Sequence, residues 1–163
     1  MTPEAPSGPP EVRLAGPDDV VRLVELYEAA VSELGTMRGG RVLLGLNGRT
    51  RPLAVSFSRQ VKGPGGQLVV GAVGGEVVGY GSCATRSLPG PELLGVVEEL
   101  YVALRARRAG VGRAIAESLM SWCRSQGCTG VDASALPGSR AVKSFFEANG
   151  FTARLLVMHR SLS

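Results

Sequence analysis

Residues 93–126 constrain the fold of this chain more than any other stretch. Residues 93–102 form a mostly apolar run that contains Glu98 and Glu99, which predicts a largely buried strand. A loop rich in arginine and glycine follows, and residues 110–126 then carry apolar side chains at helical spacing. Residues 129–133 predict another strand. A strand–helix–strand unit of this kind is parallel and right-handed.

The loop between this strand and this helix is suited to binding an anion. Arg105, Arg107, Arg108 and Arg113 lie close together on it, so the positive charge is local. Gly110 has no Cβ, so the backbone can approach a phosphate closely, and the N–H groups that begin a helix favour negative charge. The alternative is a tight turn with solvated arginines. No aromatic residues interleave with these arginines, which argues against a nucleic-acid groove.

The remaining apolar patterns predict an α/β fold built around this unit. Strand patterns occupy residues 11–15, 67–73, 76–86 and 152–160, with Gly74-Gly75 as a hairpin turn. Helix patterns occupy residues 20–34, 53–62 and 137–149, whereas residues 37–48 are glycine-rich and ambiguous. We expect a mixed, mostly antiparallel sheet of about six strands with helices on both faces and a central parallel β-α-β unit.

Three residues are expected to mark helix ends. Asp18 or Asp19 can accept hydrogen bonds from the first turn of the helix at residues 20–34, and Ser139 can open the helix at residues 137–149. Gly35 is expected to end the first of these helices.

Length and composition predict one globular domain without a membrane segment. The chain has 163 residues and a formal net charge of +4, and nearly all of its cations are arginine. No run of about 18 apolar residues is present. Residues 1–10 contain four prolines, which predicts a disordered lead before a single domain at residues 11–163. Cys83, Cys123 and Cys128 lack metal-ligand spacing, so we expect reduced thiols in the cytoplasm and no metal.

Two motifs resemble the GNAT superfamily of N-acetyltransferases. Residues 107–112, Arg-Arg-Ala-Gly-Val-Gly, fit the pattern Arg/Gln-x-x-Gly-x-Gly/Ala of its acetyl-CoA pyrophosphate loop. Residues 141–151, Ala-Val-Lys-Ser-Phe-Phe-Glu-Ala-Asn-Gly-Phe, are similar to its later helix, which commonly ends in Tyr-Glu-x-x-Gly-Phe. The resemblance covers roughly residues 11–162. It implies the GNAT fold and transfer of an acetyl or longer acyl group from acyl-CoA to an amine, by direct attack in a ternary complex.

The resemblance also implies which residues bind acetyl-CoA. Backbone groups of Leu100, Tyr101 and Val102 would bind the pantetheine like an added strand, with the Leu100 N–H donating to the thioester oxygen. Ser139 stands where the family usually has an asparagine, and would either bond the pantetheine or cap its helix. The pyrophosphate would meet the loop Arg107, Arg108, Ala109, Gly110, Val111, Gly112 and Arg113.

Phe146 departs from the family pattern. It stands where the family usually has a tyrosine that is offered as the general acid near the CoA sulfur, and phenylalanine has no proton to give. Protonation of the leaving thiolate would then fall to Tyr101 or to water. Phe146 therefore also motivates an alternative function, a CoA-binding regulatory module with weak or lost catalysis.

Glu98 and Glu99 are the candidate general bases, with Glu98 favoured. Adjacent residues on a strand face opposite sides, so one of the pair points toward the acceptor and the other away. Two carboxylates in an apolar strand are costly to bury without use or partners. The alternatives are a pair with an arginine, an exposed edge, proton transfer through water, or carboxylates that only bind the acceptor.

A dinucleotide-dependent enzyme is the third hypothesis. Gly110-x-Gly112 follows a strand and opens a helix, and Asp132 lies near the acidic position of a dinucleotide fingerprint. Ile115, however, stands where that fingerprint needs a small residue, and an arginine-rich loop intervenes. His159, the only histidine, is expected to be structural.

The partners are expected to be acetyl-CoA and a primary amine of a small molecule or protein, with no nucleic acid and no membrane. The arginines of residues 33–62 favour an acceptor with negative or polar groups, and they are Arg38, Arg41, Arg49, Arg51 and Arg59. An open last strand would also permit a homodimer.

Overall fold

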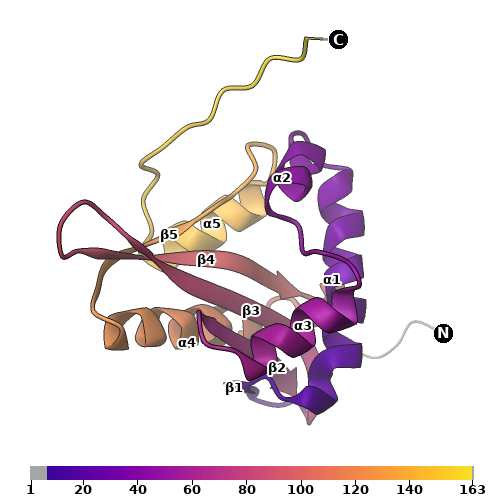
Figure 1. Ribbon diagram of the computed structural model, residues 1–163. Coiled ribbons are helices and arrows are strands. Elements are labelled where there is room, and N and C mark those ends of the chain that lie inside the picture. Colours follow the sequence, from indigo (N-terminus) through magenta and orange to yellow (C-terminus); the bar gives the residue numbers. More distant parts are fainter. Residues whose placement is uncertain (1–6, 163) are drawn as a thin grey trace.

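The computed structural model describes residues 7–162, which form a twisted sheet covered by helices (Figure 1). The strand order follows the chain, and the strands are β1 (Pro10–Leu14), β2 (Gln67–Val73), β3 (Glu76–Ser87), β4 (Leu93–Val102) and β5 (Cys128–Ala133). The first four strands pair antiparallel, and β4 pairs parallel with β5. The predicted mixed sheet and its parallel unit are therefore confirmed. Residues 1–6 of the predicted disordered lead lie outside the described residues, and Pro10 already begins β1.

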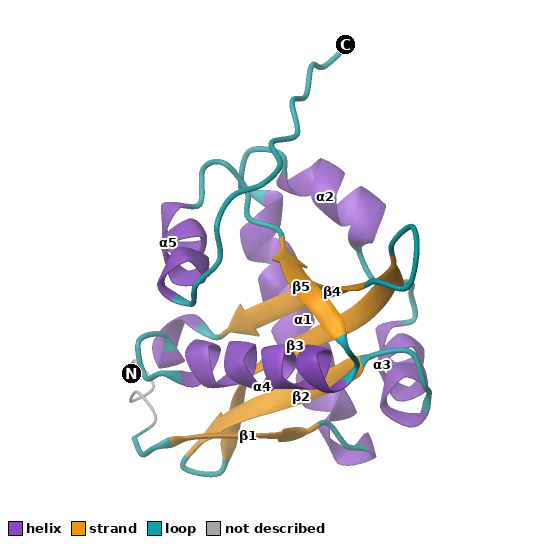
Figure 2. Cartoon of the chain, turned by 90° about the vertical axis from the view of Figure 1, so that its left-hand side faces the viewer, coloured by secondary structure: helices purple, strands orange, loops and turns teal. Residues whose placement is uncertain are grey.

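Helices cover both faces of the sheet, as predicted. Figure 2 shows α4 on one side and α1 behind the strands. The ambiguous glycine-rich stretch contains a short helix, α2, which follows α1. The helices are α1 (Val20–Gly35), α2 (Gly40–Asn47), α3 (Leu53–Lys62), α4 (Val111–Ser125) and α5 (Arg140–Ala148), with single 3-10 turns at Pro17–Asp19 and Leu104–Ala106.

The two faces of the sheet carry separate apolar cores. On the α4 face, Ile115 and Leu119 are fully buried against the strands. This close approach depends on Gly81, where a Cβ would lie 2.5 Å from Ile115 Cγ2. On the other face, α1 and α3 bury Leu23 and Phe57 against the sheet. Each such side chain stabilises the fold by about 1.5–3 kcal/mol.

The predicted strand at residues 152–160 is wrong, since none of these residues pairs in the sheet. The sheet of the described residues therefore has five strands rather than about six. Arg154 pairs with Asp132 of β5, but the following residues leave the body of the protein (Figure 1). Leu155 and Met158 are 73% and 83% exposed. The apolar run predicted burial, but in this structure no neighbouring strand covers it.

The expected helix caps also differ from the structure. Asp19 is buried, and its carboxylate accepts the Gly16 N–H at 2.7 Å and hydrogen bonds from Arg13 at 2.6 and 2.8 Å. The arginine of β1 therefore holds this carboxylate away from the first turn of α1. Ser139 precedes α5 without a side-chain cap. Gly35, by contrast, is the last residue of α1 as expected, and Thr36 after it has right-handed rather than left-handed geometry.

Candidate active site at the opening of β4

The candidate site begins where β4 separates from β5. The pairing of these strands ends at Val97 and Ala133, whereas β4 stays paired with β3 as far as Val102. Glu98 has no partner in β3, because Glu99 pairs with Ser82 and Val97 pairs with the next residue. This extra residue is a β-bulge, which bends a strand. Figure 2 shows β4 and β5 diverging beyond this point.

The opening leaves backbone groups of β4 facing the gap. Ala103 N–H donates to Val78 O at 2.8 Å, so the backbone groups of Ala103 point toward β3. Backbone direction alternates along a paired strand, so those of Leu100 and Val102 point the other way. Val102 O accepts Arg107 Nε at 2.9 Å on that side. The N–H and C=O of Leu100 therefore face the gap, as the hypothesis of an added pantetheine strand requires.

The loop after β4 contains two residues with left-handed backbone. Arg108 and Gly110 have φ angles of 71° and 81°, in the left-handed region, which is uncommon for arginine. Alternation between left-handed and ordinary backbone directs successive N–H groups to one side, which makes an anion-binding concavity. Helix α4 begins at Val111, and its first N–H groups have no acceptor within the helix. This backbone geometry is of the kind that suits an anion.

The side chains of the loop are less available than their number predicts. Arg105 pairs with Glu76, and Arg113 pairs with Glu117 at 2.9 Å. Arg107 pairs with Glu33 of α1, with nitrogen–oxygen distances of 2.9 and 2.7 Å. Among residues 7–162, Arg108 alone of the four has no ionic partner. An anion would therefore meet mainly backbone N–H groups and Arg108.

The two candidate glutamates have different surroundings. Glu98 is exposed at the bulge. Glu99 lies on the α1 and α3 face, where Arg49 Nε donates to its Oε1 at 2.9 Å and Ser82 Oγ donates to its Oε2 at 3.1 Å. The side chains of Arg49 and Glu99 are only 10% and 15% exposed. The alternative of a carboxylate paired with arginine is therefore observed for Glu99.

Arg49 holds this cluster together, and the sequence did not single it out from the other arginines. Its Nη2 donates to Gln60 Oε1 at 2.6 Å and also to Glu99, while its guanidinium lies 3.8 Å from the centre of the Phe57 ring. Its backbone N–H donates to the Tyr27 hydroxyl at 2.7 Å. The partners come from α1, α3 and β4, so only the folded chain brings them together.

Tyr101 and Phe146 lie on different elements beside the opening. Burial, and secondarily the charge of Glu33, raise the pKa of Tyr101, so its phenol remains protonated at neutral pH. Phe146 packs against Phe145 and Phe151, with ring centres 5.3 and 5.2 Å apart. A Cβ at Gly112 would lie 3.3 Å from Phe145 Cε2, so α5 lies directly beside the anion loop. Ser139 is half-buried just before α5.

The remaining reactive residue types lie elsewhere. Burial raises the pKa of the Cys83 and Cys123 thiols, as expected for small core residues. His159 is exposed on the segment after α5. Within residues 7–162, no group of three or more His, Cys, Asp or Glu side chains is placed to hold a metal ion. No helix in this part of the chain is long and apolar enough to cross a membrane.

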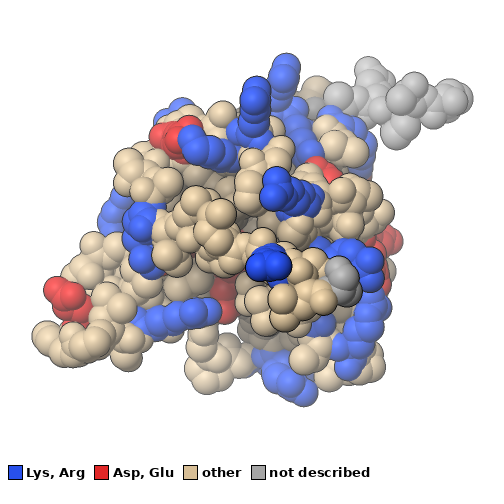
Figure 3. Space-filling model, turned by 90° about the horizontal axis from the view of Figure 1, so that it is seen from above, with Lys and Arg blue, Asp and Glu red and all other residues tan. Residues whose placement is uncertain are grey.

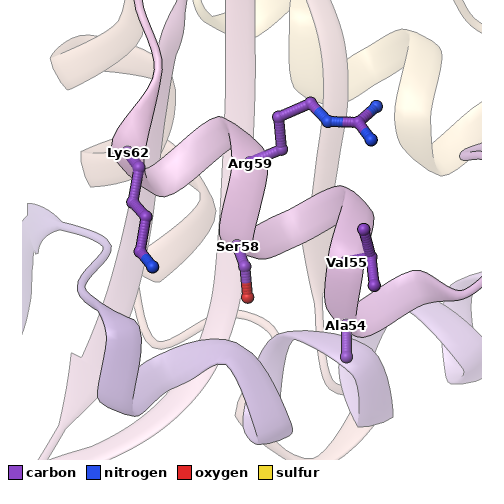
Figure 4. A pocket seen from close by; sticks show the side chains of 5 residues that line it. All are labelled: Ala54, Val55, Ser58, Arg59 and Lys62. Atoms are coloured by element: carbon purple, nitrogen blue, oxygen red, sulfur yellow. The ribbon is translucent and has the colours of Figure 1, made fainter.

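A shallow depression on α3 is separate from the opening of β4. Figure 4 shows Ala54 and Ser58 on one side of α3 with Lys62, while Arg59 points in another direction. None of its lining residues belongs to β4, β5 or α4. We assign it no role.

Comparison with known proteins agrees with the fold and the order of these elements. A profile of the acetyltransferase (GNAT) family matches residues 43–151, a range that includes the opening of β4, the anion loop and α5. The chain therefore belongs to the GNAT family of acetyltransferases. No curated protein matches it.

Solved structures resemble the whole chain at low sequence identity. A putative acetyltransferase from Agrobacterium tumefaciens is 19% identical with a TM-score of 0.73, covering 93% of this chain and 99% of its own. An aminoglycoside acetyltransferase from an uncultured soil metagenomic sample is 18% identical with a TM-score of 0.69, covering 94% and 99%. Aminoglycoside N-acetyltransferase AAC(6')-Iy, solved with CoA, is 12% identical with a TM-score of 0.71, and both chains are fully covered at 100%. At these identities the similarity establishes the fold.

Proposed function

We propose that this protein transfers an acetyl or longer acyl group from acyl-CoA to a primary amine of a small molecule or protein. The observation that carries the proposal is the opening of β4 beyond Val97, which ends at the anion loop and the start of α4. The backbone of Leu100, which faces the gap, suits pantetheine, and the loop suits a pyrophosphate. Acetyl-CoA is therefore the proposed cosubstrate, bound through the loop residues and the backbone of Leu100, Tyr101 and Val102.

The proposed chemistry is direct attack of the amine on the thioester. The Leu100 N–H would donate to the carbonyl oxygen as negative charge develops there. Glu99 lies on the face that α1 and the loop after α2 enclose, so it is the better placed carboxylate to meet an amine. Glu98, which the sequence favoured, remains a second candidate at the bulge. Tyr101 or water would supply the proton that Phe146 lacks, and Ser139 and Phe146 would contact CoA from the α5 side.

Two measurements test this function together. Calorimetry measures CoA binding, and thiol release from acetyl-CoA across a panel of primary amines measures transfer. We expect binding of CoA and amine-dependent release with at least one amine. Absence of CoA binding would contradict the proposal, because acyl-CoA is its cosubstrate.

A CoA-binding regulatory module is the second candidate. Phe146 favours it, because the position has no hydroxyl and packs instead against Phe145 and Phe151. In this case CoA would bind while no amine is acylated. Phe146→Tyr separates the two functions, because a gain in transfer rate indicates a catalytic site that lacks its acid.

We also propose that the protein forms a homodimer through the segment after α5. Leu155 and Val157 would face one side of an extended strand and Leu156 and Met158 the other, and all four are at least 73% exposed. A strand that is apolar on both faces suits the interior of a sheet. The sheet of the described residues ends at β1 and at β5, and Arg154 is anchored beside β5 through Asp132. A second copy can cover the other side.

Light scattering tests the dimer. The full chain should have twice the monomer mass, and the variant Leu156→Arg/Met158→Arg should be a monomer. Thr152→Arg is the matched control, because it adds charge next to the apolar run. A monomeric full chain at high concentration would contradict this proposal.

A cytoplasmic location is proposed as well. Its support is that Cys83, Cys123 and Cys128 are all free thiols, two of them buried. Free thiols persist in a reducing compartment. Cell fractionation of a tagged full-length chain tests it.

A further inference from the structure

The pair of Arg49 and Glu99 is unusual because it is nearly buried at the opening of β4. Its two side chains are 10% and 15% exposed, and it joins the loop between α2 and α3 to the strand next to the proposed thioester site. Removing two charges from water costs several kcal/mol, so a buried pair contributes little net stability compared with apolar residues. A pair at this position therefore calls for an explanation in terms of what it binds.

Arg49 does not use all of its hydrogen-bond donors within the protein. Its Nε and Nη2 donate to Glu99 and Gln60, whereas Nη1 donates no hydrogen bond within residues 7–162. Stacking on Phe57 holds the plane of the guanidinium in position. Arg49 also lines a depression formed by α1, α2 and the loop after α2, together with Tyr27 and Leu44. A ligand in this depression would meet a fixed guanidinium.

We propose that Arg49 is a specificity-determining residue and that the acceptor is a zwitterion of the α-amino acid type. This inference rests on the proposed acyl transfer and names its substrate class. Arg49 lines the depression and is in direct contact with Glu99 behind it, so a ligand that reaches both would meet a cation and an anion side by side. An amine with a carboxylate one carbon away carries the complementary charges at the matching spacing. An isolated amine would satisfy Glu99 alone.

The same arrangement gives each charge a role during the reaction. The substrate carboxylate binds the guanidinium of Arg49, in the manner of arginine–carboxylate pairs. Arg49 then divides its hydrogen bonds between the substrate carboxylate and Glu99. Glu99 is therefore free to accept a hydrogen bond from the substrate ammonium group. Glu99 takes one proton from it, the neutral nitrogen forms a bond to the thioester carbon, and the carbon–sulfur bond breaks. The second proton of the nitrogen passes through Tyr101 or water to the leaving CoA thiolate. The products are the N-acyl amino acid and CoA.

The charge of the surroundings agrees with an acceptor that carries an anion. Residues 33–62 contain five arginines and one lysine but a single acidic residue, Glu33, which pairs with Arg107. Figure 3 shows more basic than acidic side chains on the face seen from above. Arg51, the other arginine of the depression, pairs with Glu28 at the surface. The positive electrostatic potential of these residues would not attract a neutral or polycationic acceptor.

The test compares amino acids with their own amides. L-Amino acids with apolar, acidic and basic side chains, each paired with its α-carboxamide, are assayed by thiol release from acetyl-CoA. For the wild type we expect kcat/KM at least about tenfold higher for the best acid than for its amide, since a hydrogen bond from Arg49 to a carboxylate is stronger than one to a neutral amide. Arg49→Met should bring the two within about twofold, and Arg49→Lys should lie between them.

A control variant and a binding measurement complete the test. Arg59→Met, on the outer face of α3, is the matched control and should keep the wild-type preference. Calorimetry of the CoA-saturated wild type with the same acid and amide should show tighter binding of the acid, without requiring turnover or a variant that folds. Equal binding and equal rates for acid and amide, with amines still acylated, overturn this inference alone. If CoA binds and no amine is acylated, the proposed function fails and this inference fails with it.

Discussion

Two arginine-rich loops of this protein use the same residue type in opposite ways. In the anion loop at residues 105–113, three of four arginines pair with carboxylates of the protein, and α4 begins with N–H groups that have no acceptor within the helix. In the loop after α2, Arg49 is nearly buried, and its guanidinium organises Glu99, Gln60 and Phe57.

The difference between the two loops lies in burial and partners, and not in the number of charges. An exposed arginine in a pair with glutamate contributes at most about 1 kcal/mol, because water and salt screen it. A buried arginine interacts far more strongly with its neighbours. We therefore expect the donor side to depend on backbone geometry and the acceptor side on one guanidinium and one carboxylate.

The largest expected effect is on the acceptor side. Glu99→Gln should lower kcat about 100-fold, because the amide keeps a hydrogen bond to Arg49 but cannot accept the proton. Glu98→Gln should have a much smaller effect, since its side chain is exposed at the bulge. Steady-state kinetics of thiol release measures both. The reverse ranking would make Glu98 the base and leave Glu99 with a binding role.

Substitutions in the two loops should also differ strongly in their effect on the stability of the protein. Arg49→Met should destabilise the protein by about 2–3 kcal/mol, because it leaves the Glu99 carboxylate buried without its partner. Arg105→Gln should change the free energy of unfolding by less than about 0.5 kcal/mol. Urea unfolding measures both variants. Glu99→Gln added to Arg49→Met should recover part of the loss, and no recovery would mean that the pair is not the source.

Backbone geometry should dominate on the donor side. Gly112→Asp should weaken CoA binding about 30-fold, because it places a negative charge at the start of α4, next to the phosphates. Gly112→Ala makes the same close contact with Phe145 without the charge, and should weaken binding only about threefold. Calorimetry with CoA decides. Equal effects of both variants would show that packing of α5, and not charge, is responsible.

The pair of Arg13 and Asp19 extends the comparison to pH. Hydrogen bonds from Arg13 and Gly16 hold the pKa of Asp19 below its usual range, against the opposing effect of burial. The unfolded state therefore binds a proton first as pH falls, and the stabilisation present at neutral pH is lost as pH drops below about 4 toward the folded pKa. Asp19→Asn should cost about 1–2 kcal/mol at pH 7.

The same variant provides its own control at low pH. Thermal unfolding of wild type and Asp19→Asn between pH 7 and pH 3 should show their difference shrinking as pH falls. A difference that stays constant over this range would show that Asp19 is not ionised through Arg13 in the folded state.

Local patterns in the sequence predicted most of the fold. The bounds of β2 and β4 and of the helix at residues 53–62 agree with the structure, because apolar spacing and glycine turns act over a few residues. The segment at residues 152–160 was predicted wrongly as a strand for the same reason. Its apolar run is a local signal, but a strand also needs a neighbouring strand to pair with. This segment leads away from β5 after Arg154 and has no such neighbour among residues 7–162.

The sequence alone determined the order of β4, the anion loop and α4, and with it the backbone geometry suited to a phosphate. Those features depend on residues that are close together in the chain. Only the tertiary structure decided which arginines are free to bind a ligand and which pair within the protein. Arg107 pairs with Glu33 of α1, and Arg49, from the loop after α2, pairs with Glu99 of β4. An ion pair between distant residues depends on where helices pack, and no periodicity in either segment encodes that position.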